Sequence, residues 1–366
     1  MKPRVLATIV GARPQFIKAA ALSKAIAVDE RFEEKLIHTG QHYDLNMSGI
    51  FFSEMNLPPP SYNLSVGSGN HGDQTGMMMI SVETVLKEIQ PDCVIVYGNI
   101  NSTLAGSLVA AKLQIPVAHV EAGLRSFNRR MPEEINRICA DHLSSYLFTP
   151  TPTAVDNLLR EGVSRKSIHP VGDIMLDAFQ LFSDVAAGCS TVLGRLGLDN
   201  RRFAIATVHR AENTADTIRL SQIFKAFDLL AQDIPVLFPM HPRVRNLLKL
   251  RPDLGDLLKN VTVLPALSYL DMLALQNKAC LIATDSGGLQ KEAYFARCPC
   301  VTLRTETEWT ELVDSGWNRL VSPDSCAQEI YQQILAQMVA PTSDLSEAIT
   351  CYGNGDCAQK ILTALA

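Results

Sequence analysis

The sequence predicts an α/β protein with two domains, each built on a parallel sheet covered by helices. Its 366 residues are enough for two domains of roughly 150 residues each. Short apolar segments alternate with longer helical patterns, which is typical of parallel strands joined by right-handed crossovers. The apolar segments are β-branched and nearly continuous, as expected for strands that are covered on both faces.

The predicted elements fall into two sets separated near residues 170–173, which divides the chain into domains 1–171 and 172–353. In the first set, strands are expected at 5–10, 35–38, 93–97, 117–120 and 146–148, and helices at 16–27, 76–89, 102–113, 133–144 and 154–160. In the second set, strands are expected at 203–208, 236–239, 261–264, 281–284 and 300–303, and helices at 217–232, 269–274, 289–296 and 327–339. A final helix over about 354–366 fits either domain by its pattern alone.

Charge, cysteine content and hydropathy indicate which partners and which cellular compartment the chain is suited to. The net charge of -5 predicts no broad attraction to nucleic acid or to an anionic membrane, so an anionic ligand would need a local basic site. The nine cysteines are scattered and odd in number, which favours reduced thiols in the cytoplasm. Cys298 and Cys300 lack a second close pair, so no metal site is predicted, and Cys300 is expected to begin a buried strand. No apolar stretch reaches about 18 residues, so no membrane span is predicted.

Ligands of open α/β sheets bind beyond the carboxyl ends of the strands, so the residues that follow each strand are the candidates. After the first strand, Gly11 permits a tight turn and Arg13 and Lys18 place two cations near a helix start, where an anion is favoured. A solvated surface turn is the alternative. After the strand at 93–97, Asn99 and Asn101 are expected to face the cleft, although Ser102 could simply cap the next helix.

The strand at 117–120 is followed by the densest group of charged residues. Glu121 stands at the strand end, where a carboxylate is costly without a task or a partner. Glu133 and Glu134 begin the next helix after a proline, and Glu133 and Arg137 are spaced to pair at i,i+4. Separated carboxylates beside cations suit acid–base catalysis, whereas helix capping and surface ion pairing explain Glu134.

The second domain offers two histidines and a glycine turn at its strand ends. His209 and His241 each follow a strand and are expected to be proton carriers, phosphate donors or structural histidines. Ser286, Gly287 and Gly288 open a helix whose backbone N–H groups suit a phosphate, and Glu292 lies one turn further on. This turn is neither a dinucleotide fingerprint nor a Walker loop, so neither a dinucleotide nor ATP is indicated.

Six segments together resemble the non-hydrolysing UDP-N-acetylglucosamine 2-epimerases, over nearly the whole chain. They are GARPQFIK (11–18), TGQHYD (39–44), EAGLRS (121–126), RMPEEINR (130–137), HRAEN (209–213) and DSGGLQKEA (285–293). The resemblance implies a GT-B fold with two Rossmann-like domains around a cleft, a final helix that packs on the first domain, and a homodimer. It also implies inversion at the sugar C2 without NAD or any other cofactor, by elimination and re-addition of UDP through a glycal.

The same resemblance implies roles for individual residues. Asn99, Glu121, Glu133, Arg137 and His209 match catalytic positions. Arg13, Lys18, His241, Ser286, Gly287, Gly288 and Glu292 match UDP contacts, and Gln41, His42, Arg125 and Arg304 are candidates for the sugar. The family usually has an aspartate where this chain has Asn99, and an amide cannot accept a proton as a carboxylate can. If the family's aspartate is the C2 base or its electrostatic partner, this chain is expected to be slow or inactive, whether the asparagine is natural or engineered.

Within the family, the chain looks more like the branch that acts on UDP-2,3-diacetamido-2,3-dideoxy-glucuronic acid for surface polysaccharide such as O-antigen. GARPQFIK, TGQHYDLNMSGIFF and the segment at 307–312 carry this likeness. A substrate carboxylate would require an extra cation, for which Arg125, Arg129, Arg130 and Arg304 are candidates. The alternatives are a UDP-N-acetylglucosamine 2-epimerase, a hydrolysing relative that releases UDP, a GT-B glycosyltransferase that needs an acceptor, and a non-enzymatic UDP-sugar sensor.

Overall fold

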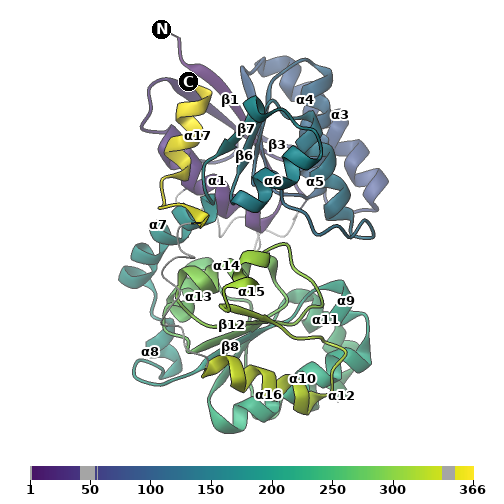
Figure 1. Cartoon of the computed structure of the whole chain (residues 1–366), viewed down its shortest axis with the longest axis vertical. Helices are drawn as coiled ribbons and strands as arrows, with labels where there is room; N and C mark the ends of the chain where they lie inside the picture. The colour runs from purple at the N-terminus through teal and green to yellow at the C-terminus, as the bar shows by residue number, and fades with distance from the viewer. Residues whose placement is uncertain (1, 42–53, 56, 340–350) are drawn as a thin grey trace. The chain divides into compact units, whose positions relative to one another are not determined.

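A computed structural model describes residues 2–41, 54–55, 57–339 and 351–366 (Figure 1). The chain forms two compact units: unit 1 comprises Met1–Leu181 and Thr350–Ala366, and unit 2 comprises Phe182–Ile349. The division therefore falls later in the chain than the expected boundary after Val171. The reason is helix α7 (Ile174–Cys189), an apolar segment that the sequence pattern did not single out and within which unit 1 ends and unit 2 begins.

Unit 1 contains a seven-stranded parallel sheet in the order β3-β2-β1-β4-β5-β6-β7. The strands are β1 (Arg4–Val10), β2 (Phe32–His38), β3 (Tyr62–Asn63), β4 (Cys93–Tyr97), β5 (Val117–Val120), β6 (Tyr146–Thr149) and β7 (Ile168–Pro170). The register is continuous across the centre, where Thr8 of β1 lies opposite both Leu36 of β2 and Ile95 of β4. The predicted strands at 93–97 and 117–120 are confirmed at both ends, whereas the short edge strands β3 and β7 were not predicted.

The helices of unit 1 are α1 (Arg13–Ile26), α3 (His71–Ile89), α4 (Asn101–Lys112), α5 (Pro132–Leu143), α6 (Pro152–Arg160) and α17 (Cys357–Leu365). One face of the sheet packs on α3 and α4 through a core that includes Ile9, Val82, Val96 and Val109. Figure 1 shows α1 and α17 on the opposite face, where they contact each other.

The C-terminal segment is held in unit 1 by hydrogen bonds to residues near the start of α7. The backbone N–H of Asp173 donates to the carbonyl of Tyr352 at 2.8 Å, and the backbone N–H of Ala358 donates to Oδ1 of Asp177 at 2.9 Å. Burial raises the pKa of Asp177 to about 6. The backbone hydrogen bonds from the first turn of α17 act in the opposite direction but are outweighed. The final helix therefore returns to unit 1 after the chain has completed unit 2.

Unit 2 contains a six-stranded parallel sheet in the order β10-β9-β8-β11-β12-β13. The strands are β8 (Ala204–Thr207), β9 (Val236–Pro239), β10 (Thr262–Leu264), β11 (Leu281–Thr284), β12 (Cys300–Thr302) and β13 (Asn318–Leu320). Successive strand residues enter opposite cores. Ala204 and Ala206 pack toward α10 (Thr217–Asp233) and α16 (Ala327–Met338), whereas Ile205 packs toward α13 (Tyr269–Gln276) and α14 (Gly287–Phe295). This alternation confirms the prediction of a doubly covered sheet. Cys300 begins β12 as predicted, and burial raises the pKa of its thiol to about 12.

The longer helices of unit 2 include α10 (Thr217–Asp233), α13 (Tyr269–Gln276), α14 (Gly287–Phe295) and α16 (Ala327–Met338). The shorter ones are α8 (Val192–Leu196), α9 (Ala211–Thr214), α11 (Pro242–Leu250), α12 (Pro252–Gly255) and α15 (Thr310–Asp314). The 3-10 turns include η1 (Arg165–Ser167) in unit 1 and η2 (Asp256–Leu258) in unit 2.

Each sheet has one point where the strand order reverses direction. In unit 1 this point lies between β1 and β4, and in unit 2 it lies between β8 and β11. Loops leaving adjacent strands diverge to opposite faces there, which opens a crevice at the carboxyl ends. The fold therefore directs attention to the residues that follow β1, β4 and β5 in unit 1 and β8, β9 and β11 in unit 2.

Candidate active site

In unit 1 the carboxylate of Glu121 lies at the end of β5 and forms an ion pair with Lys18 of α1. The two side chains are only 8% and 9% exposed, so both charges are largely removed from water. The backbone of Glu121 is left-handed, with φ of 75°, an unfavourable conformation for a residue other than glycine. Such strain persists only where the surrounding structure fixes it, and it concentrates at functional sites.

Gly98 brings the turn after β4 against this ion pair. A Cβ added at Gly98 would lie 3.3 Å from Oε2 of Glu121 and 3.5 Å from Nζ of Lys18, and its φ of 60° also favours glycine. Asn99 is the next residue along the chain. We call this group the unit 1 cluster: Lys18, Gly98, Asn99 and Glu121. Lys18, expected at a phosphate, here stabilises the negative charge of Glu121.

Asn99 and Asn101, which were expected to face the ligand together, lie in different surroundings. Asn99 is half-buried, and its backbone carbonyl accepts a hydrogen bond from Nδ2 of Asn136 at 3.0 Å. Asn101 is buried, donates to Oε1 of Gln74 at 2.9 Å and accepts from Asn136 at 3.2 Å. The amide of Asn101 therefore joins α4 to α3 and α5.

The two carboxylates at the start of α5 differ in a way that their spacing did not reveal. Glu133 is exposed, whereas Glu134 is 1% exposed and accepts backbone N–H bonds from Ser126 at 3.0 Å and Phe127 at 2.9 Å. Arg137 pairs with Glu134 at 2.8 Å and i,i+3, and not with Glu133 as the i,i+4 spacing suggested. Glu134 is a buried structural group of the segment after Glu121, which corrects its interpretation as a surface residue.

Arg125, a candidate for the sugar, is fully engaged in a buried network. Its guanidinium is 1% exposed and lies 2.7 Å from both Asp141 and Glu161. The burial of this guanidinium opposes its charge, but Glu161 and Asp141 outweigh that effect and raise the pKa of Arg125. Its donors are directed at these carboxylates and at the carbonyl of Leu124, and its contact with the sugar stays a prediction.

The remaining sugar and UDP candidates of unit 1 are only partly described. Oε1 of Gln41 accepts a hydrogen bond from Oγ of Ser102 at 2.8 Å. Arg13 begins α1, but its side chain lies outside the described part of the chain, as does the whole of His42. Their predicted roles stay predictions.

In unit 2 the buried carboxylate of Asp285 organises the turn that carries His209. It accepts backbone N–H bonds from His209 at 3.0 Å and Arg210 at 2.9 Å, and a side-chain bond from Asn213 at 3.0 Å. Nδ1 of His209 lies 3.2 Å from Oδ1 of the same carboxylate. The imidazole is 33% exposed, so Asp285 holds it on its buried side while the rest of the ring stays accessible to solvent. Sequence analysis did not assign Asp285, although it opens the DSGG turn.

His241 stacks on His209, with ring centroids 5.1 Å apart and planes inclined by 27°. Its Nδ1 accepts the backbone N–H of Arg243 at 3.2 Å, which caps α11, and Nη1 of Arg243 donates to the His209 carbonyl at 3.2 Å. The ends of β8 and β9 therefore present two adjacent imidazoles.

The turn after β11 forms the N-terminus of α14. Ser286 caps the helix by accepting the N–H of Leu289. Among the described residues, and apart from the chain neighbours and backbone of α14 itself, no heavy atom lies within 4 Å of a Cβ added at Gly288. A ligand phosphate can therefore approach this backbone closely. At Gly287 the carboxylate of Glu308 is near, since Oε1 would lie 2.9 Å from an added Cβ.

Two further candidates of unit 2 are buried and have partners. Arg304 donates to Oε2 of Glu308 at 3.0 Å, so its charge is already balanced by a carboxylate. Glu292, expected at the ribose, is 8% exposed and accepts a hydrogen bond from Gln276 at 3.0 Å.

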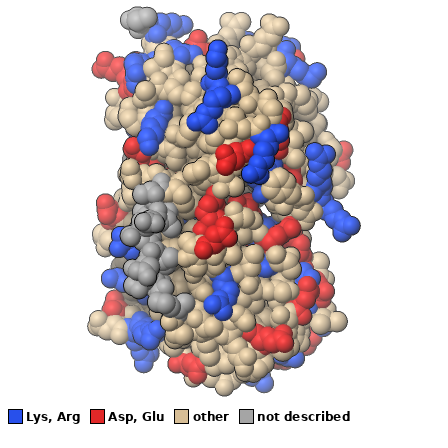
Figure 2. All heavy atoms as spheres, viewed as in Figure 1, with Lys and Arg blue, Asp and Glu red and all other residues tan. Residues whose placement is uncertain are grey.

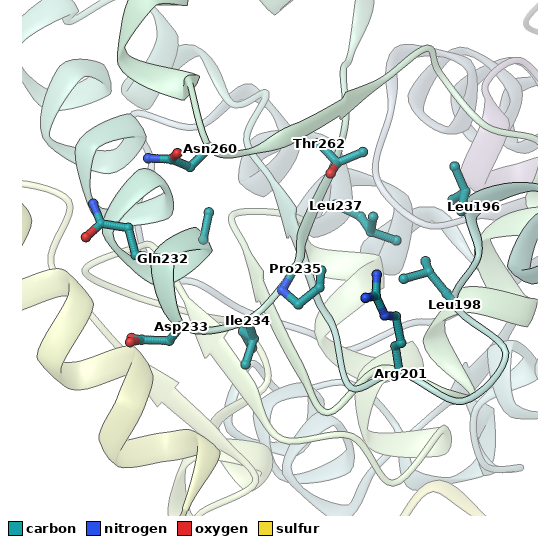
Figure 3. Close-up of a pocket in the computed structure, with 11 residues that line it drawn as sticks. Leu196, Leu198, Arg201, Gln232, Asp233, Ile234, Pro235, Leu237, Asn260 and Thr262 are labelled. Atoms are coloured by element: carbon teal, nitrogen blue, oxygen red, sulfur yellow. The ribbon is translucent and has the colours of Figure 1, made fainter.

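A cavity of about 420 Å³ in unit 2 lies elsewhere (Figure 3). Pro235, Asn260 and Thr262 line it, and these residues lie just before β9 or at the start of β10. It therefore opens at the amino ends of the strands, and it contains none of the predicted site residues. Ligands of such sheets bind at the opposite edge, so we give this cavity no catalytic role.

The two parallel-sheet units, with candidate residues at their strand ends, are those of a GT-B protein. The family model for UDP-N-acetylglucosamine 2-epimerase matches residues 24–366, and the chain belongs to this family. The UDP-2,3-diacetamido-2,3-dideoxy-D-glucuronate 2-epimerase of Pseudomonas aeruginosa is 45% identical over 98% of each chain. A UDP-N-acetylglucosamine 2-epimerase homolog of Methanococcus maripaludis is 46% identical over 98% of this chain and 99% of its own.

Solved structures agree with this assignment. The UDP-GlcNAc 2-epimerase of Methanocaldococcus jannaschii in complex with UDP-GlcNAc and UDP is 41% identical, with a TM-score of 0.90 over 99% of each chain. The Neisseria meningitidis enzyme bound to UDP-GlcNAc is 29% identical, with a TM-score of 0.88 over 99% of each chain. The predicted family and fold class are thereby confirmed.

The surface is of mixed charge. Figure 2 shows Lys and Arg side chains interspersed with Asp and Glu side chains over the face in view. Among the residues that the structure describes, no helix combines the length and apolar character that a membrane span requires.

Proposed function

We propose that this chain inverts C2 of a UDP-sugar, with the unit 1 cluster supplying the acid–base groups and the strand ends of unit 2 binding UDP. The observation that supports this most directly is Glu121: a nearly buried carboxylate, in a left-handed backbone conformation, paired with Lys18 beside the turn that carries Asn99. A strained and ionised carboxylate at a strand end is suited to proton abstraction.

The proposed reaction proceeds by elimination and re-addition. A base takes the proton from C2, the electron pair forms the C1–C2 double bond, and the anomeric C–O bond breaks to leave UDP and a glycal. Re-addition of UDP at C1 and delivery of a proton to the other face of C2 give the epimer. Glu121 and the exposed Glu133 are the proposed proton carriers, and His209 is the proposed donor to the leaving phosphate.

UDP-2,3-diacetamido-2,3-dideoxy-glucuronic acid is the substrate that we favour, with the mannuronic epimer as product. The Pseudomonas aeruginosa relative supports it. In unit 1, Arg129 and Arg130 are exposed in the segment between Glu121 and α5, and a substrate carboxylate would be attracted to such cations. The product would serve a surface polysaccharide such as O-antigen, made by a cytoplasmic homodimer that needs no cofactor.

UDP-N-acetylglucosamine is the alternative substrate, with UDP-N-acetylmannosamine as product. The Methanocaldococcus jannaschii structure, which holds UDP-GlcNAc and UDP, supports this alternative at 41% identity.

Parallel incubation with both UDP-sugars in deuterated water tests the proposal. We expect deuterium at C2 of both epimers, faster with the diacetamido-uronic acid, and UDP released only in trace amounts. Deuterium incorporated faster into the N-acetylglucosamine pair would favour the alternative. Stoichiometric UDP release would indicate a hydrolase, and exchange with neither sugar, in this chain or its Asn99→Asp variant, would overturn the proposal.

A further inference from the structure

His119 lies in β5, two residues before Glu121, and its side chain is fully buried. Its Nδ1 lies 2.7 Å from Oδ1 of Asp141, and its Nε2 lies 2.7 Å from the backbone carbonyl of Gly98. The imidazole therefore joins β5 to α5 on one side and to the turn of the unit 1 cluster on the other.

These partners fix the protonation of the ring. A peptide carbonyl can only accept, so Nε2 must carry a hydrogen. Oδ2 of Asp141 already accepts from the backbone N–H of Gly123 at 3.1 Å and from Nη1 of Arg125 at 2.7 Å. With the carboxylate ionised, Nδ1 must carry a hydrogen as well, which makes the ring an imidazolium.

The ionised state of Asp141 agrees with its surroundings. Burial acts to raise the pKa of Asp141, but the neighbouring charges of His119 and Arg125 outweigh it and hold that pKa below its ordinary value. Arg125 in turn pairs with Glu161, just after α6, at 2.7 Å, and the imidazole of His142 in α5 lies 3.2 Å from Glu161. Cations and carboxylates thus alternate from the turn outward, so the imidazolium is compensated.

We propose that His119 is a positioning residue of the proposed 2-epimerase: a buried imidazolium, held by Asp141, that fixes the Gly98–Asn99 turn against Glu121. The proposal rests on the proposed function for its catalytic consequence. Its structural basis is the pair of short bonds from one ring to two separate elements. The turn lies so close to Glu121 that a Cβ added at Gly98 would meet its Oε2 at 3.3 Å, so a shift of this turn changes the separation between Asn99 and Glu121. Misplacement by about 1 Å can lower a rate about 100-fold.

The charge of the ring is tested first, without reference to activity. The whole protein is labelled with 15N in its histidine rings, and the His119 signals are assigned by their loss in His119→Asn. We expect both ring nitrogens of His119 to carry a hydrogen, because each faces an oxygen that can only accept. A neutral tautomer would overturn the proposal.

The positioning role is tested by two variants that each keep one of the bonds. The amide nitrogen of His119→Gln can reach the place of Nε2 and donate to Gly98, whereas that of His119→Asn replaces Nδ1 and donates to Asp141. We expect the Asn variant to have a kcat at least about 10-fold below that of the Gln variant, with similar KM and similar loss of Tm. Equal kcat values would overturn the positioning role.

The two tests separate this proposal from the function on which it rests. If the parent chain and its Asn99→Asp variant lack epimerase activity, the proposed function fails while the ring measurement still decides the charge of His119. If the parent is active and the ring is neutral, the proposed function stands and the imidazolium is wrong.

Discussion

At the scale of single residues, the ion pair of Glu121 and Lys18 concentrates opposite charges where little water reaches them. Burial of this kind makes each charge dependent on the other, since removing one partner leaves an uncompensated buried charge. The adjacent Asn99 is neutral, and its backbone carbonyl, not its side chain, is the group that Asn136 holds. An exchange of this side chain therefore leaves that bond to the turn intact.

Asn99→Asp is expected to raise kcat at least about 100-fold, the lower end of acid–base contributions, because a carboxylate can accept a proton. Steady-state kinetics with the favoured UDP-sugar measures the change. Asn101→Asp is the matched control: the same chemical change, but in a buried amide network, should lower stability without a gain in rate. Equal kcat for Asn99→Asp and the parent would contradict the prediction.

Arg129→Ala, Arg130→Ala or their combination is expected to raise KM for the uronic acid substrate at least about 10-fold, the equivalent of one charged hydrogen bond. KM for UDP-N-acetylglucosamine should stay unchanged, because that sugar has no carboxylate. Arg165→Ala, which removes another exposed arginine of unit 1, serves as the control. An equal rise for both sugars would show that the arginines do not read the carboxylate.

Among the helices and strands, α5 holds β5 and the loop after it in place through hydrogen bonds to two buried carboxylates. Asp141 accepts from His119 of β5 and from Arg125 after that strand, while Glu134 near the other end of the helix accepts from the loop at Ser126 and Phe127. The helix therefore fixes the segment that follows Glu121 at two places, through Asp141 at one end and Glu134 at the other. Both carboxylates are fully paired, as buried charges must be.

Arg125→Met is expected to lower the free energy of unfolding by about 3–5 kcal/mol, because it leaves Asp141 with one cation fewer in a buried site. Chemical denaturation followed by circular dichroism measures the loss. Arg129→Met removes an exposed cation from the same segment and should cost under about 0.5 kcal/mol. A stable Arg125→Met protein with raised KM alone would support Arg125 as a substrate contact.

At the scale of the whole molecule, unit 1 is completed only when the last helix returns to it. The Asp177 carboxylate, near the start of α7, receives the N-terminus of α17, and its pKa is raised from 3.8 to about 6 by burial. The folded protein thus binds this proton more tightly than the unfolded chain does. Stability from this group is fully present below about pH 3.8 and decreases as the pH rises toward 6.

Across that interval, the parent is expected to lose up to about 3 kcal/mol relative to Asp177→Asn, since one pKa unit corresponds to about 1.4 kcal/mol. The asparagine keeps an acceptor for Ala358 and cannot ionise. Denaturation of both proteins at about pH 4 and about pH 7 measures the difference. Parallel pH dependences for the two proteins would exclude the contribution of Asp177.

The central strands, the class of fold and the family could be predicted from the sequence, whereas the short edge strands β3, β7 and β13 could not. Both ends of β4, β5, β9 and β11 were predicted to the exact residue. A strand that is covered on both faces is a short, continuous run of apolar residues, which can be read from the sequence. The position of Glu121, His209 and Ser286 after strands followed from the same pattern, since parallel strands deliver their carboxyl ends to one edge.

The pairing of the charged side chains became visible only in the folded chain. Glu133 and Glu134 are neighbours in the sequence, yet packing directs one to solvent and the other to Arg137, and spacing permits either pairing. Arg125 and Arg129 are equally cationic in the sequence, but only Arg125 is enclosed by two carboxylates from distant segments. The partner of a long charged side chain depends on its burial and on which groups the fold brings near it, and the local pattern of the sequence contains neither.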